Sequence, residues 1–118
     1  MKLITIILVI FVAIEHYYFL ILEMFLWTKP RTIKAFGIKN KAFADETKVL
    51  AANQGLYNGF PASGLIFSLI TKDSSIAVFF LACIVIAGIY GAYSTKKMKL
   101  FYIQAVPAMA TLITIILN

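Results

Sequence analysis

The chain has few of the residues that build disulfides and metal centres. Its 118 residues include one cysteine and one histidine, with five acidic residues against eleven lysines and arginines. Cys83 has no partner within the chain, so we expect it to pack as a small hydrophobic side chain. One histidine without a cysteine pair is a poor set of metal ligands. We therefore predict no metal and no cofactor. An enzyme is the least favoured class, because the sequence has no cysteine pair, no histidine cluster and no phosphate-binding motif.

Apolar residues, in contrast, make up 62% of the chain and gather in four long stretches. Crossing the hydrocarbon core of a bilayer, which is about 30 Å thick, takes about 17–25 helical residues. Each stretch is about that long. The pattern predicts an all-α, polytopic membrane protein, in which residues 1–118 form a single domain with a bundle of four transmembrane helices. The stretches are Leu3–Trp27, Val49–Ile70, Ile76–Tyr93 and Leu100–Leu117.

The basic residues predict how these helices are oriented. The first connection, residues 28–48, contains six lysines and arginines, and the third, residues 94–99, contains three. The N-terminus and the second connection contain only Lys2 and Lys72. Because cytoplasmic connections carry an excess of positive charge, we predict that both termini lie outside and that the protein lies in the inner (cytoplasmic) membrane. Lysines at helix ends also suit anionic headgroups, so the expected partners are membrane lipids and not nucleic acid.

The first connection is long enough to have structure of its own. Pro30 is expected to end the first helix near Thr28. Apolar residues then alternate with lysines, which favours a short interfacial segment in the headgroup layer, broken at Gly37, over a solvated loop. Asp45 is expected to cap the helix that follows.

Polar side chains within the apolar stretches are the candidates for function. An ionisable group at the centre of a bilayer costs about 2.5–3.5 kcal/mol, so it normally faces other helices and has partners. The first stretch contains Glu15, His16 and Glu23, of which His16 and Glu23 share a helical face. The second stretch begins with polar residues that fall within one arc of about 140°. They are Asn53, Gln54, Tyr57 and Asn58.

The expected depths of these residues place them in two layers. Five residues lie about one turn from the cytoplasmic end of a predicted helix, so that all four helices contribute to one layer. They are Glu23, Asn53, Gln54, Tyr90 and Gln104. Glu15, His16 and Asn58 form a second layer nearer the middle. The two layers predict either a polar pocket that opens toward the cytoplasm or a hydrogen-bonded network that locks the bundle.

Several segments resemble a known family. The run LEMFLWT at residues 22–28, the pair Phe36-Gly37 and the run LAANQGLYNG at residues 50–59 resemble the domain-of-unknown-function family 1304. The segments AGIYG at residues 87–91 and QAVPA at residues 104–108 are similar to it as well. The resemblance covers nearly the whole chain and implies a small bacterial integral membrane protein, without implying an activity.

Three functions remain open on this evidence. A membrane protein that binds a small ligand or lipid needs only the polar pocket, and it is the preferred prediction. A small proton- or cation-coupled transporter would use Glu15 or Glu23 as its responsive carboxylate. A structural membrane protein would use the same residues to lock the bundle, and a homodimer is compatible with each of these functions.

Overall fold

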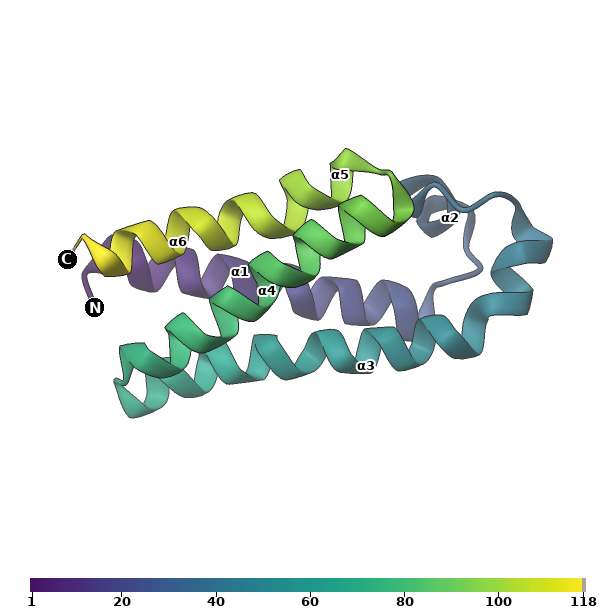
Figure 1. The fold of residues 1–118 in the computed structure, drawn as a ribbon. Coiled ribbons are helices and arrows are strands. Elements are labelled where there is room, and N and C mark those ends of the chain that lie inside the picture. Colours follow the sequence, from purple (N-terminus) through teal and green to yellow (C-terminus); the bar gives the residue numbers. More distant parts are fainter. Residues whose placement is uncertain (118) are drawn as a thin grey trace. The chain divides into compact units, whose positions relative to one another are not determined.

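The computed structural model describes residues 1–117, and every regular element in that range is a helix. The helices are α1 (Leu3–Phe25), α2 (Pro30–Phe36), α3 (Lys41–Thr71), α4 (Ser74–Thr95), α5 (Met98–Leu100) and α6 (Val106–Ile116), with the π-helical turn η1 (Phe101–Ala105) before α6 (Figure 1). The prediction of an all-α protein is confirmed over these residues. Asn118, which belongs to the predicted external C-terminus, lies outside them.

Three segments are long and apolar enough to cross a membrane. They are α1, α4 and the continuous segment Met98–Ile116. With 31 residues, α3 is the longest helix, but it is not among the three. Its first two turns carry lysines and acidic residues, and its next turns carry amides, all of which lower its hydropathy. Three of the four stretches predicted to span the membrane therefore form helices that are long and apolar enough to do so. The fourth, in α3, does not reach that hydropathy because of its polar residues.

The chain forms two compact units, and the division between them falls inside α1 and α3. Unit 1 consists of Met1–Ile14 and the chain from Pro61 onward, whereas unit 2 consists of Glu15–Phe60. In unit 1, α4 packs against η1 and α6. The first helix also contacts the last, because Thr5 Oγ1 donates a hydrogen bond to Thr114 Oγ1 at 2.9 Å.

The π-helical turn in unit 1 has a local cause. Pro107 has no backbone N–H, and in a regular α-helix its ring would collide with the carbonyl of Ile103. The widened turn avoids this collision, and the backbone N–H of Val106 donates to the carbonyl of Phe101, five residues earlier. The turn brings Ala105 against α4, where a Cβ on Gly88 would lie only 3.0 Å from the Ala105 backbone nitrogen.

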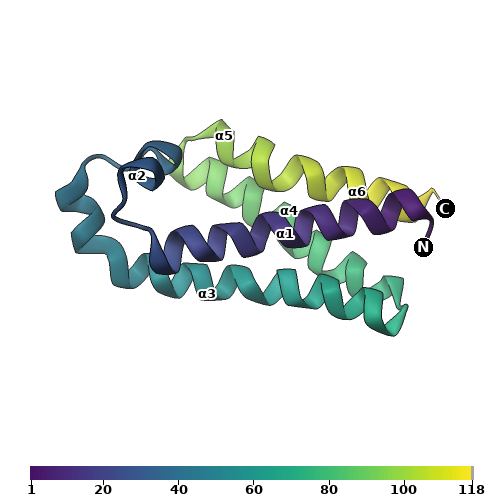
Figure 2. The same ribbon diagram turned by 180° about the vertical axis from the view of Figure 1, so that it is seen from behind.

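In unit 2, the second half of α1 runs antiparallel to the first part of α3, with α2 beside their connection (Figures 1 and 2). The helix α2 ends at Gly37, where the sequence predicts a break, and Gly37 adopts the left-handed conformation with φ 63°. Trp27 holds the connection in place. Its ring packs on Phe36 with centroids 5.2 Å apart, and its Nε1 donates to Thr47 Oγ1 of α3 at 3.0 Å.

The start of α3 differs from the prediction. The helix begins at Lys41, well before Val49, because Asn40 caps it: the Asn40 Oδ1 accepts a hydrogen bond from the backbone N–H of Phe43 at 2.8 Å. Asp45, the predicted cap, instead lies within the helix and pairs with Lys41 at 3.3 Å. The charged start of α3 therefore extends the helix beyond its apolar part.

Candidate functional site

The centre of unit 2 is the carboxylate of Glu23, a residue that is only 1% exposed. Its Oε2 accepts a hydrogen bond from Gln54 Nε2, and its Oε1 accepts one from Asn58 Nδ2. Gln54 and Asn58 are four residues apart, so both amides lie on the face of α3 that is turned toward α1. Each carboxylate oxygen therefore has an amide donor, which offsets the cost of burying the group. We call these three residues the Glu23 network.

Two glycines allow α3 to approach α1 closely enough for this network. A Cβ on Gly55 would lie 2.9 Å from Glu23 Cβ and 3.1 Å from the backbone carbonyl oxygen of Leu20. A Cβ on Gly59 would lie 2.7 Å from Leu20 Cδ1. Because a backbone oxygen in a helix cannot rotate away as a side chain can, the contact at Gly55 requires glycine. The two glycines directly follow the two amides, so one short run supplies both the close approach and the donors.

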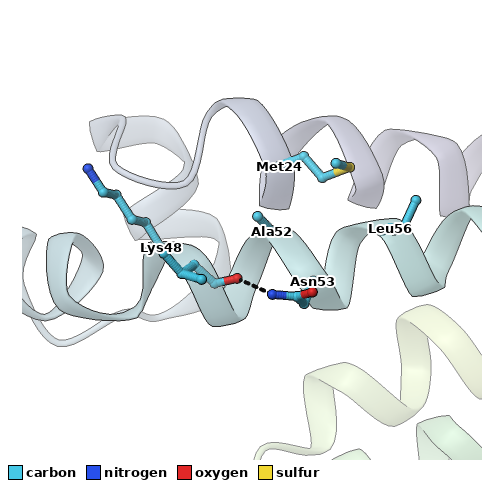
Figure 3. Close-up of a pocket in the computed structure, with 6 residues that line it drawn as sticks. Met24, Lys48, Ala52, Asn53 and Leu56 are labelled. Carbon is cyan, nitrogen blue, oxygen red and sulfur yellow. Dashed lines mark hydrogen bonds between the residues drawn. The ribbon is translucent and has the colours of Figure 1, made fainter.

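A groove of about 360 Å³ lies on the adjoining part of α1 and α3. It is lined by Met24, Lys48, Val49, Ala52, Asn53 and Leu56. Figure 3 shows Met24 on α1 facing α3, with Ala52 and Leu56 on the side of α3 turned toward α1. Lys48, Ala52 and Leu56 follow each other at intervals of four residues and therefore share a helical face. Ala52 has the smallest side chain of the lining. We call this feature the α1–α3 groove.

The predicted polar arc of α3 divides into two parts. Gln54 and Asn58 bond Glu23, whereas Asn53 Nδ2 donates to the backbone carbonyl of Val49 at 2.9 Å within α3. Asn53 therefore belongs to the lining of the α1–α3 groove and not to the network. Tyr57 is 66% exposed, and its ring packs edge-on against Phe60.

Glu15 and His16 lie earlier on α1. His16 is buried and its ring makes an edge-on contact with Phe19, with centroids 5.2 Å apart. Glu15 Oε1 is buried 3.9 Å from His16 Nδ1 and has no hydrogen-bond partner among the described residues. Asn58 was predicted to share a layer with these two residues, but its amide bonds Glu23. The reason is that Asn58 follows Gln54 by four residues and so faces the same carboxylate.

The other two predicted site residues belong to unit 1. Tyr90 is 67% exposed on α4, and Gln104 is half-buried in η1. Within unit 2, the structure brings together Glu23, Gln54 and Asn58. Residues 1–117 contain no cluster of three or more histidine, cysteine or acidic side chains that could hold a metal ion.

The α1–α3 groove was not among the predicted features. Along the sequence, Lys48 adds to the positive charge of the first connection, and Ala52 and Leu56 belong to the apolar stretch that follows. The signal that could have found the groove is their common spacing: a cation, a small residue and a large apolar residue follow one another on one face, at the point where α3 becomes apolar.

Comparison with known proteins identifies the family. The family described as "Protein of unknown function (DUF1304)" matches residues 10–116. The chain belongs to this family. A relative, the "Uncharacterized protein YpaA" of Lactococcus lactis subsp. lactis (strain IL1403), is 30% identical over 117 residues, which cover 97% of this chain and 98% of that protein. No solved structure matches the chain. The DUF1304 match includes the Glu23 network and the whole α1–α3 groove, and it confirms the family that the sequence resembles.

Proposed function

We propose that this DUF1304 protein is a multi-pass protein of the inner membrane that binds an amphiphilic small molecule or lipid in the α1–α3 groove. The observation that carries the proposal is the composition of the groove, in which apolar side chains from two helices adjoin one amide and one cation. Its volume of about 360 Å³ falls within the range of small-molecule sites, about 300–1,000 Å³, and such sites are mostly apolar with a few polar groups.

In this proposal α3 is the fourth membrane span, and the protein is a four-helix bundle with α2 in the headgroup layer. The obstacle is the polarity of α3, because an unpaired amide in hydrocarbon costs several kcal/mol. The hydrogen bonds reduce that cost: Gln54 and Asn58 donate to Glu23, and Asn53 donates to its own helix. The distribution of lysines then favours a cytoplasmic connection between α1 and α3, with external termini.

The Glu23 network has a supporting role in this proposal. Its hydrogen bonds fix the register of α1 against α3, and that register sets the position of Met24 in the lining of the groove. The carboxylate of Glu23 is buried and both its oxygens accept hydrogen bonds, so the ligand is expected to contact the groove and not this carboxylate.

Each of two other functions is favoured by one observation. A purely structural membrane protein is favoured by the closed Glu23 network, which needs no ligand to satisfy it. A proton- or cation-coupled transporter is favoured by Glu15 and His16, two ionisable groups that lie 3.9 Å apart within α1. The transporter requires that Glu15→Gln abolish a measurable flux in reconstituted liposomes, whereas the proposed binding function requires no flux.

Native mass spectrometry of the protein purified in mild detergent tests the proposed function. We expect the wild type to retain a bound amphiphile and Ala52→Phe to lose it, because the larger side chain fills the groove. Ala110→Phe is the matched control, since Ala110 lies on an exposed face of α6 in unit 1. Equal retention by all three proteins, or retention by none, contradicts the proposal.

A further inference from the structure

The α1–α3 groove has a charged end and an apolar end. Lys48 is the one charged residue in its lining, and Figure 3 shows it at one end of the groove, with its ammonium directed away from Met24, Ala52 and Leu56. Ala52 and Leu56 lie one and two turns further along α3, so the apolar wall extends about 12 Å from Lys48. A molecule with an anionic head and an apolar chain matches this order of side chains.

The ammonium of Lys48 has no ion-pair partner in the part of the chain that the structure describes. Asp45, the acidic residue one turn away, is paired with Lys41 at 3.3 Å. The same unit contains further cations on α2, including Arg31 and Lys34, which add to a positive potential at this end of α1 and α3. An anion at Lys48 would therefore meet a cation that is not already paired with a carboxylate of the described residues.

The position of Lys48 along α3 indicates where the anion comes from. Residues 41–48 are largely polar and charged, and Val49 begins the apolar part of the helix. Such a boundary lies at the level of the lipid headgroups, where a lysine side chain reaches the phosphates and the apolar residues beyond it lie in hydrocarbon. Trp27 is bonded to Thr47 at the same end of the helix pair, and tryptophan is enriched at this level of a membrane.

We propose that the α1–α3 groove is a site for an anionic phospholipid. The phosphate binds the Lys48 ammonium, and an acyl chain lies along Ala52 and Leu56 opposite Met24. This inference rests on the proposed function and specifies its ligand.

The test compares two lipids with identical acyl chains in detergent solution, anionic phosphatidylglycerol and zwitterionic phosphatidylcholine, by native mass spectrometry of the full chain. We expect the wild type to prefer phosphatidylglycerol about fivefold, the effect of one nearby lysine. Lys48→Gln should remove most of this preference and Lys48→Arg should keep it. Lys72→Gln, which removes one positive charge in the turn between α3 and α4, is the matched control and should behave as the wild type.

The outcomes separate the inference from the proposed function. Equal binding of the two lipids that is still lost in Ala52→Phe overturns the anionic ligand but keeps an amphiphile in the groove. A phosphatidylglycerol preference that survives Lys48→Gln overturns the role of Lys48. Displacement of the lipid by millimolar inorganic phosphate overturns the phospholipid assignment, because it shows that the head alone is recognised. Binding of neither lipid overturns the inference, whereas the proposed function fails only if the wild type retains no amphiphile or retains it equally in Ala52→Phe.

Discussion

Glu23 of α1 accepts a hydrogen bond from Asn58 of α3 through one carboxylate oxygen, while Gln54, one turn earlier, bonds the other oxygen. Two donors that are one turn apart define the register of the two helices. Sliding α3 by one turn, about 5.4 Å, would leave one carboxylate oxygen without its amide. A buried, unsatisfied oxygen costs more than the net value of its hydrogen bond, so the pair disfavours other registers.

The network predicts the effect of Glu23→Gln. The glutamine side chain has one oxygen and one NH₂ group. Its oxygen accepts a hydrogen bond from one of the two amides of α3, but its NH₂ group faces the NH₂ group of the other amide, and two donors do not bond each other. We expect a loss of about 1–3 kcal/mol of stability, measured by thermal unfolding in detergent. Glu46→Gln is the control, since Glu46 lies exposed near the start of α3, and it should leave the melting temperature unchanged. A wild-type melting temperature for Glu23→Gln would contradict the network.

The close approach of α1 and α3 predicts opposite effects for two glycines. At Gly55, an added methyl group would meet Met24 Cγ at 2.8 Å and the Leu20 carbonyl oxygen at 3.1 Å, so Gly55→Ala should destabilise the protein by about 1–3 kcal/mol. At Gly91, the nearest atom is Leu100 Cδ1 at 3.8 Å, and Gly91→Ala should be neutral or stabilise by up to about 1 kcal/mol through helix propensity. Thermal unfolding of the two variants side by side checks this order, and the reverse order would refute it.

The contrast between α2 and the Glu23 network shows what the sequence could predict. The end of α2 at Gly37 follows from local chemistry, because glycine adopts positive φ without strain. Local chemistry does not predict which residues of the polar arc bond Glu23. The sequence gives the positions of Asn53 and Asn58 around α3, but it does not indicate on which side of α3 the helix α1 lies. The glycines contain that information: Gly55 and Gly59 mark the contact face, and each of the two amides that bond Glu23 directly precedes one of them.

The cap of α3 shows a second limit. Asn40 and Asp45 are both good N-cap residues, and the choice between them depends on whether the charged segment that separates them is helical. That segment is helical in the structure, where the pair Lys41–Asp45 has the four-residue spacing that supports a helix. The apolar stretch alone marks only the part of α3 proposed to lie in the membrane.

The proposed orientation predicts which connections are accessible from outside. Single cysteines introduced by Lys72→Cys and Lys97→Cys, in a protein that also carries Cys83→Ser, separate the two sides. We expect an impermeant maleimide to label position 72 on intact cells and to label position 97 only after the cells are opened, because the proposed orientation places the third connection in the cytoplasm. Labelling of position 97 on intact cells would reverse the orientation, and equal labelling of both positions would mean two orientations.

Asp73 predicts a pH-dependent contribution to the start of α4. Its Oδ1 accepts hydrogen bonds from the hydroxyl of Ser75 at 2.6 Å and from the Ser75 backbone N–H at 2.9 Å, and these bonds lower the pKa of the carboxyl below its ordinary value. A group with a lowered pKa in the folded state stabilises the protein above its unfolded pKa, and this effect is lost as pH falls through the folded pKa. The wild type should therefore melt above Asp73→Asn at pH 7, and the difference should close in acid. A difference that persists at a pH low enough to protonate Asp73 in the wild type would contradict this explanation.

Fluorescence quenching of Trp27 tests ligand binding in the α1–α3 groove most directly, because Trp27 is the one tryptophan of the chain and is bonded to Thr47, the residue before Lys48. A phosphatidylglycerol with brominated acyl chains is titrated into the protein in unbrominated detergent. We predict saturable quenching in the wild type and in Ala110→Phe, and binding at least about tenfold weaker in Ala52→Phe, the effect of about 1.4 kcal/mol. Quenching that rises without saturation, or that is identical in all three proteins, would contradict a lipid site in the groove.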